Sequence, residues 1–161
     1  VESLLKEKGL TLGVAESCTG GLMAKRLTDI PGSSQVFKGG IVSYTNEVKA
    51  GVLGVPQHLL DQLGAVSAEV ALAMAEGARR VLGCDIALSS TGVAGPDKDE
   101  WDHEVGTMFV GIATPEGTYV RPLHITLRPV RERLRTITAH HAFDLARRYL
   151  TGLDYEAGMP Q

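Results

Sequence analysis

One stretch near the N-terminus constrains the fold most. An apolar run over 10–15 passes directly into the small and polar residues 15–21, and residues 22–27 then place apolar side chains at helical spacing. The pattern predicts a strand that ends at Ala15 and a helix that begins near Gly20. Such a turn directs backbone N–H groups and the positive end of a helix dipole toward whatever lies above it.

The same turn carries two side chains with nucleophilic chemistry, the hydroxyl of Ser17 and the thiol of Cys18. A nucleophile beside backbone donors suits acyl transfer, because the developing oxyanion needs hydrogen bonds. We expect only one of the two to face a ligand, since neighbouring side chains on a turn point in different directions. A purely structural interpretation is that Thr19 caps the helix while Gly20 and Gly21 allow close packing.

The rest of the chain alternates between predicted helices and strands and ends with a hairpin and a helix. Strands are predicted over 11–15, 36–44, 86–89, 106–113 and 118–126. Helices are predicted over 1–8, 20–30, 46–53, 56–63, 67–82 and 130–150. This order predicts an α/β fold, a three-layer α/β/α sandwich with a mixed, mostly parallel sheet. We expect one domain over 1–150 and a loose tail over 151–161.

Two Gly-rich turns follow predicted strands, one at 15–21 and one at 90–96. Ligands of such sheets bind beyond the carboxyl ends of the strands. We therefore expect Ser17 and Thr91 to face the same crevice.

Composition limits the classes of partner. The 161 residues carry a formal net charge of -3, which does not favour non-specific nucleic-acid binding. No apolar run is long enough to cross a membrane, and no signal peptide is recognisable. Two cysteines do not suggest a disulfide framework, so a cytoplasmic setting is expected. The chain begins with Val1, as a trimmed chain or a piece of a longer one would.

A serine nucleophile needs a base, and histidine is the commonest one. The histidines lie outside the Gly-rich turns and suggest no Ser-His-Asp arrangement: His58, His103, His124, His140 and His141. A lysine that is desolvated enough to be neutral can do the same work. Lys49 is the candidate, five residues after Tyr44, whose phenol can share the proton. The competing interpretation is a solvated lysine on a short helix.

Charged side chains also gather at two other places. Arg128, Arg131 and Arg135 lie near the start of the last predicted helix, where cations oppose the helix dipole. A bound anion such as phosphate would explain them, and a solvated basic face is the alternative. The acidic residues of 97–104 match neither zinc-site nor EF-hand spacing, so we expect an exposed loop without a metal.

Several motifs in one order resemble the CinA C-terminal domain family, over about 1–150: 15–21, 31–34, 39–40 with 44–49, 64–67 and 91–96. The resemblance implies a three-layer α/β/α fold, usually as a homodimer, and no cofactor. It implies hydrolysis of the carboxamide of nicotinamide mononucleotide, a small-molecule nucleotide substrate, to nicotinic acid mononucleotide and ammonia.

The resemblance also implies roles for individual residues. The nucleophile falls on Ser17, the catalytic tyrosine and lysine on Tyr44 and Lys49, and substrate contacts on Thr91, Gly92 and Arg131. From the turn geometry we add that backbone N–H groups of Thr19, Gly20 and Gly21, or of the Thr91–Gly92 turn, hold the oxyanion.

This chain departs from the family in the loop after Pro96. Family members typically continue with glycines and a threonine, whereas here 97–104 is acidic and bulky. If that loop lies near a substrate phosphate, its carboxylates repel it. Two alternatives to the nicotinamide nucleotide amidase therefore stand: a nucleotide-binding module that has lost catalysis and serves regulation or partner binding, and an amidase for another small amide.

Overall fold

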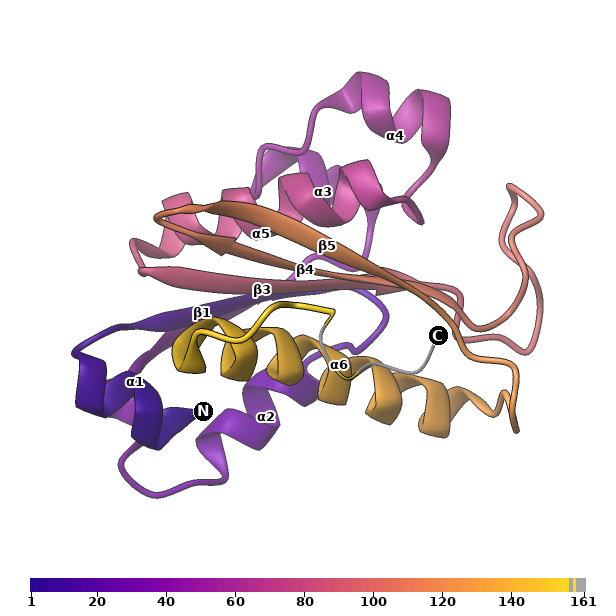
Figure 1. The fold of residues 1–161 in the computed structure, drawn as a ribbon. Coiled ribbons are helices and arrows are strands. Elements are labelled where there is room, and N and C mark those ends of the chain that lie inside the picture. Colours follow the sequence, from indigo (N-terminus) through magenta and orange to yellow (C-terminus); the bar gives the residue numbers. More distant parts are fainter. Residues whose placement is uncertain (157, 159–161) are drawn as a thin grey trace.

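A five-stranded sheet with helices on both faces forms the framework of the computed structural model, which describes residues 1–156 and 158 (Figure 1). The strands are β1 (Leu12–Glu16), β2 (Phe37–Val42), β3 (Ile86–Gly92), β4 (Thr107–Thr114) and β5 (Gly117–His124). The helices are α1 (Glu2–Lys8), α2 (Leu22–Thr28), α3 (Asn46–Gly51), α4 (Gln57–Leu63), α5 (Ala68–Leu82) and α6 (Arg131–Thr151), with a short 3-10 turn, η1 (Ser33–Gln35).

The sheet order is β2-β1-β3-β4-β5. The pairs β1–β2 and β1–β3 are parallel, while β4 runs antiparallel to both β3 and β5. Only β4 is therefore reversed, which confirms the predicted mixed, mostly parallel sheet. The register slips between Leu12 and Gly13 opposite the start of β2, beside the Gly39–Gly40 pair.

Helices α1, α2 and α6 lie on one face of the sheet and α3, α4 and α5 on the other, so the predicted three layers are present (Figure 1). β1 is buried on both faces, as a central parallel strand must be. One apolar core fills the space between β1, β3, β4 and α6, and a second lies beneath α5. Ser67 caps α5, since its hydroxyl accepts a hydrogen bond from the Val70 N–H at 3.1 Å.

One residue of the segment after Thr151, where a loose tail is expected, packs against β5. Gly152 caps α6 in a left-handed conformation, and the Tyr155 ring stacks on Tyr119 of β5 with centroids 4.5 Å apart. The Tyr155 carbonyl also accepts a hydrogen bond from buried Arg121 at 2.7 Å. Tyr155 thus packs against the core, while 151–154 and 156 are exposed and 157 and 159–161 lie outside the described residues.

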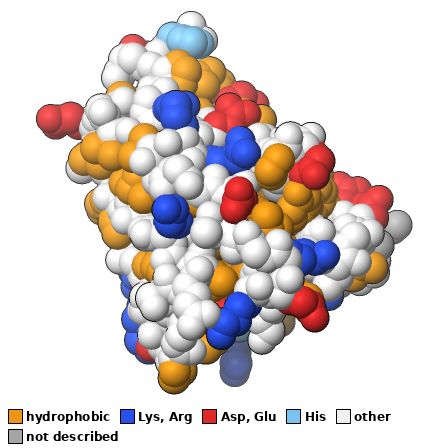
Figure 2. Space-filling view, turned by 90° about the vertical axis from the view of Figure 1, so that its left-hand side faces the viewer, with side chains coloured by type: hydrophobic (Ala, Val, Ile, Leu, Met, Phe, Trp, Pro, Cys, Tyr) orange, Lys and Arg blue, Asp and Glu red, His pale blue; other side chains and the backbone are white. Residues whose placement is uncertain are grey.

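The end of the molecule near the start of β1 carries charges of both signs. Figure 2 shows Lys and Arg side chains there interspersed with Asp, Glu and hydrophobic ones. None of the helices in the described part of the chain has the length and hydrophobicity that crossing a bilayer requires.

Candidate active site

A pocket of about 360 Å³ lies at the carboxyl ends of β1 and β3, where the sequence predicts a crevice. Its lining includes Ser17 and Cys18 from the turn after β1, Tyr44 and Lys49 from the segment after β2, Thr91 and Gly92 from β3, and Arg131 from α6. Segments far apart in the sequence therefore meet here, since they all follow strands that end at this edge of the sheet.

Lys49 and Ser17 are in direct contact at the bottom of this pocket. The Lys49 Nζ lies 2.9 Å from the Ser17 Oγ, and both residues are buried. Lys49 is completely inaccessible to solvent, which excludes the solvated lysine weighed from the sequence. The short α3, capped by the Thr45 hydroxyl, directs the side chain inward.

Two backbone carbonyls orient the Lys49 amine. The Nζ donates to the carbonyls of Ser43 at 2.8 Å and Tyr44 at 3.2 Å. A neutral amine has two N–H bonds and one lone pair, so when both N–H bonds go to these carbonyls the lone pair faces the Ser17 hydroxyl. Burial lowers the pKa of Lys49 to about 8. The geometry and the pKa together give a base for the Ser17 proton.

Cys18 is unsuited to the nucleophile's role. It is buried next to Ser17, and burial raises the pKa of its thiol to about 12. The thiolate is the reactive form of cysteine, and it is scarce at neutral pH under such a pKa. Of the two nucleophiles in the turn, Ser17 is therefore the one with a base in contact.

Glu16 holds the turn that presents Ser17. Its buried carboxylate accepts hydrogen bonds from the N–H groups of Met23 at 2.8 Å and Ala24 at 3.0 Å, at the start of α2. It also accepts from the Thr19 hydroxyl at 2.6 Å. These helix N–H groups, which the sequence analysis left open to a ligand, are thus occupied by the chain's own carboxylate.

The other turn residues named from the sequence lie behind the pocket. Thr19 is fully buried and contacts the hydroxyl of Ser90, and the Gly20 N–H donates to the Ser17 carbonyl at 3.1 Å. Thr19, Gly20 and Gly21 are not among the residues that line the pocket. Gly20 and Gly21 both have a positive φ, which explains the need for glycine in this turn.

Tyr44 lies at the mouth of the pocket rather than against the Ser17–Lys49 pair. Its side chain is 60% exposed, and its hydroxyl accepts a hydrogen bond from Arg131 at 3.3 Å. Arg131 also donates to the carbonyl of Gly95. The carbonyl of Tyr44, not its phenol, is the group that contacts Lys49. Arg131 and Tyr44 thus form one edge of the opening.

Thr91 and Gly92 contribute a wall. The Thr91 hydroxyl donates to the Ala65 carbonyl at 2.7 Å, so it is committed to joining β3 to the turn before α5. A side chain at position 92 would collide with β4, because an added Cβ would lie 2.0 Å from the Met108 sulfur. Glycine at this position is therefore required by the packing of the sheet as well as by the pocket.

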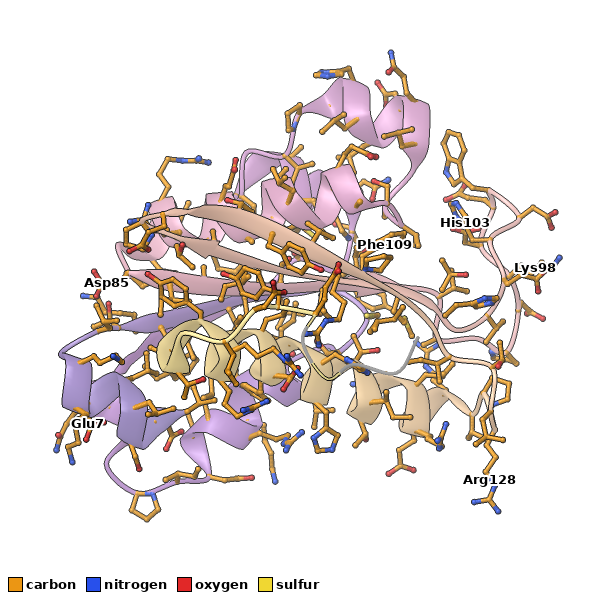
Figure 3. All side chains as sticks on the ribbon, viewed as in Figure 1. Glu7, Asp85, Lys98, His103, Phe109 and Arg128 are labelled. Carbon is orange, nitrogen blue, oxygen red and sulfur yellow. The ribbon has the colours of Figure 1, made fainter. Side chains whose placement is uncertain are left out.

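The acidic loop forms the remaining side of the opening. Asp97, Asp99 and Glu100 line the pocket, while Lys98 makes ion pairs with Asp102 and Glu104. Figure 3 shows Lys98 and His103 on this loop, beyond the end of the sheet. The sequence interpretation of a plain exposed loop is thus incomplete. Among the described residues, no group of three His, Cys, Asp or Glu side chains is arranged to hold a metal ion.

The three arginines singled out from the sequence do not form one anion site. Arg131 contacts the pocket, whereas Arg135 donates to the carbonyls of Cys18 at 3.0 Å and Thr19 at 2.9 Å. Arg128 is exposed and points away from the body of the protein (Figure 3).

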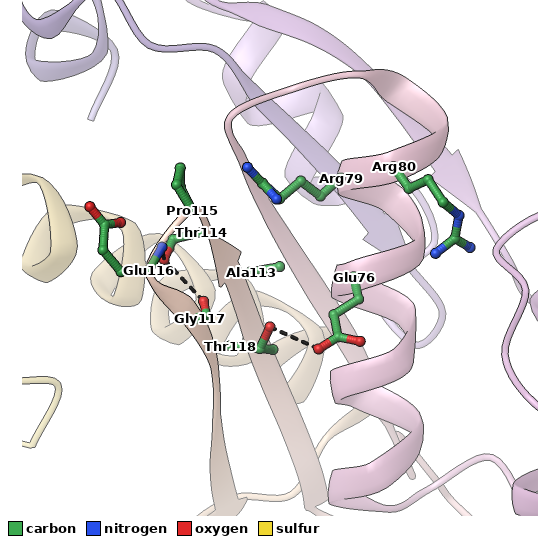
Figure 4. Close-up of a pocket in the computed structure, with 9 residues that line it drawn as sticks. All are labelled: Glu76, Arg79, Arg80, Ala113, Thr114, Pro115, Glu116, Gly117 and Thr118. Atoms are coloured by element: carbon green, nitrogen blue, oxygen red, sulfur yellow. Dashed lines mark hydrogen bonds between the residues drawn. The ribbon is translucent and has the colours of Figure 1, made fainter.

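A second cavity lies between α5 and the hairpin that joins β4 to β5 (Figure 4). Its polar groups are paired locally: the Thr118 hydroxyl donates to Glu76 at 3.1 Å, and Arg79 and Arg80 donate to the carbonyls of Asp85 and Leu53. Its hydroxyl–carboxylate contact, between Thr118 and Glu76, is exposed, whereas Ser17 meets a buried amine, so the Ser17 pocket is the candidate active site.

The roles of Glu16 and Arg135 were not predicted from the sequence. A carboxylate at the end of an otherwise apolar strand was a usable signal, because such a group must find buried donors. The partners of Arg135 lie 116 and 117 positions away, so no local pattern points to them.

Known proteins resemble this chain over nearly its whole length. The model of the CinA C-terminal domain matches residues 1–150. A CinA-like protein of Geobacter metallireducens is 53% identical over 150 residues, which are 93% of this chain and 36% of that protein. The chain thus spans about a third of the length of the curated relatives it matches.

Solved structures of CinA proteins have the same fold as this chain. The competence/damage inducible protein CihA of Agrobacterium tumefaciens superposes with a TM-score of 0.87 at 35% identity, over 92% of this chain and 90% of that one. A CinA superfamily protein of Klebsiella pneumoniae gives a TM-score of 0.88 at 27% identity, over 93% and 92% of the two chains. The chain belongs to the CinA C-terminal domain family.

Proposed function

We propose that this domain is an amidohydrolase that converts nicotinamide mononucleotide to nicotinic acid mononucleotide and ammonia. The observation that carries the proposal is the 2.9 Å contact between the buried Lys49 amine and the Ser17 hydroxyl. The choice of substrate rests on the resemblance to the family. The family also suggests a homodimer, and a cytoplasmic location goes with pyridine nucleotide salvage.

In the proposed reaction the neutral Lys49 amine takes the proton of Ser17 as its oxygen attacks the carboxamide carbon. The resulting oxyanion is held by backbone N–H groups, for which the pocket-lining end of β3 at Thr91 and Gly92 is favoured over Thr19–Gly21. Collapse breaks the C–N bond, and the protonated Lys49 gives its proton to the amide nitrogen, which leaves as ammonia. Water then attacks the acyl-serine with Lys49 as base, which releases the acid and restores Ser17.

Arg131 is proposed to orient the substrate at the mouth of the pocket, together with Tyr44. Both side chains are exposed there and contact each other. In this position Tyr44 acts on the substrate, and its link to Lys49 runs through its carbonyl. No metal or organic cofactor has a part in the proposed steps.

The test measures ammonia release from nicotinamide mononucleotide, with calorimetry of binding on the same samples. Wild type is expected to release ammonia, and Ser17→Ala is expected to bind the nucleotide without turnover. Cys18→Ala is the matched control on the same turn and should retain turnover. Binding by wild type without ammonia release would instead support a nucleotide-binding module without catalysis, and full activity of Ser17→Ala would refute the nucleophile.

A further inference from the structure

The charges around the pocket are unevenly divided between its bottom and its rim. Of the described residues, five charged side chains line it: Lys49, Asp97, Asp99, Glu100 and Arg131. Lys49 lies at the bottom and is neutral in the form that accepts the Ser17 proton. In that reactive form Arg131 is the one cation in the lining, and it faces three carboxylates.

Nearby cations do not cancel this excess. Lys98 is directed to Asp102 and Glu104, at 3.4 and 3.1 Å, rather than to the carboxylates of the lining. His103 contacts Asp99 at 2.6 Å and can neutralise that one carboxylate when it is protonated. The lining then carries one net negative charge instead of two, so it is negative in either state of His103.

The loop that carries these carboxylates is fixed in place. Asp99 accepts hydrogen bonds from the N–H groups of Trp101 at 3.1 Å and His103 at 2.8 Å. The Trp101 indole lies over Gly64, where even a methyl group would come within 2.3 Å of its Nε1. Gly64 precedes Ala65 and Val66 of the pocket wall, so the loop spans the opening from β3 to the turn before α5.

A phosphate dianion near such a rim is repelled, while a pyridinium cation is attracted. We propose that Asp97, Asp99 and Glu100 make this site select amides of cationic, unphosphorylated compounds, so that nicotinamide riboside is preferred over its 5′-phosphate. This inference rests on the amidase chemistry of the proposed function and replaces the mononucleotide with the riboside as the preferred substrate. Riboside and mononucleotide share the carboxamide and the pyridinium ring and differ only in the phosphate. The ratio of their kcat/KM values therefore reports on how the charges around the pocket act on the phosphate.

The experiment compares kcat/KM for riboside and mononucleotide in wild type and in the double variant Asp97→Asn, Glu100→Gln. Wild type should favour the riboside, and the double variant should shift the ratio toward the mononucleotide by about fivefold. The shift should shrink as salt is raised, because these side chains are exposed. Asp102→Asn is the matched control, since Asp102 lies on the same loop, is 87% exposed and does not line the pocket.

An unchanged ratio in the double variant, or an equal shift in Asp102→Asn, overturns the proposal. The same two ligands are also titrated into the Ser17→Ala forms by calorimetry, which separates this inference from the proposed function. If Ser17→Ala binds the riboside more tightly than the mononucleotide and the double variant abolishes this difference, the inference is supported. If neither compound then yields ammonia, only the amidase proposal fails. Equal affinities in both forms overturn the inference whatever the activity.

Discussion

The guanidinium of Arg135, on the second turn of α6, donates hydrogen bonds to the backbone carbonyls of Cys18 and Thr19, at 3.0 and 2.9 Å. The last helix thus holds the turn that presents Ser17 to Lys49. Arg135 touches neither member of that pair, so we regard it as a positioning residue. Its charge also lies close to Gly20, where an added Cβ would come within 3.1 Å of the guanidinium.

Arg135→Met should lower kcat by about 10- to 100-fold with a small change in KM, since a displaced nucleophile harms the reaction more than binding. Steady-state kinetics on the amide substrate checks this, and Arg135→Lys should recover part of kcat. Arg133→Met is the control, because Arg133 lies on the same helix and contacts the Leu127 carbonyl outside the pocket. Equal losses in both variants would show a general effect on α6 rather than positioning.

Glu16→Gln should destabilise the protein. In wild type the two Glu16 oxygens accept from two N–H groups of α2 and from the Thr19 hydroxyl. An amide has only one oxygen, and its NH2 group would face one of these donors and leave that donor without an acceptor. A buried donor left without an acceptor costs about 1–3 kcal/mol. Urea unfolding measures the change, with exposed Glu47→Gln, in the first turn of α3, as the control. A loss no larger than that of the control would contradict the capping role.

Asp144 anchors a cluster of arginines between α6 and β5. Burial alone would raise its pKa, but hydrogen bonds from Arg147, Arg148 and Arg121 lower the pKa to about 2. A carboxyl whose pKa is lower in the folded than in the unfolded state contributes stability at pH values above its ordinary pKa near 3.8, and that stability is lost as the pH falls toward 2. Protonation of Asp144 should therefore contribute to the fall in the free energy of unfolding as the pH is lowered.

Asp144→Asn should cost about 3 kcal/mol at pH 7, because Arg121 is left buried without its counter-charge. The difference from wild type should narrow below pH 3.8. Chemical unfolding at several pH values measures both effects. Asp29→Asn, which breaks the exposed pair with Lys25, is the control and should cost less than about 1 kcal/mol. A constant difference between pH 7 and pH 2 would contradict the assignment.

Much of the fold could be predicted because local sequence patterns indicate most of its strands and helices. Apolar runs predicted the strands, and the helix predicted over 67–82 corresponds to α5. Boundaries were less predictable: β3 extends to Gly92 rather than ending at 89, because its extra residues pair with β4. Local periodicity cannot show such pairing.

The residues of the candidate site could be predicted better than their orientations. Chemistry and family resemblance named Ser17 and Lys49, and the structure places them in contact. The orientation of Tyr44 was not predictable, because it depends on Arg131, which follows it by 87 positions. The same limit applies to Trp101, whose neighbour Gly64 belongs to a different turn. Contacts between distant segments leave no periodic trace in one sequence.

The most direct test of the central claim is the pH dependence of ammonia release by wild type and by Lys49→Met. Only the neutral amine accepts the Ser17 proton, so kcat/KM should rise about tenfold per pH unit and level off near pH 8, where burial has placed the pKa of Lys49. Lys49→Met should lose about 100- to 10,000-fold in kcat/KM while remaining folded. A flat profile from pH 6 to 9, or wild-type activity in Lys49→Met, would contradict the account.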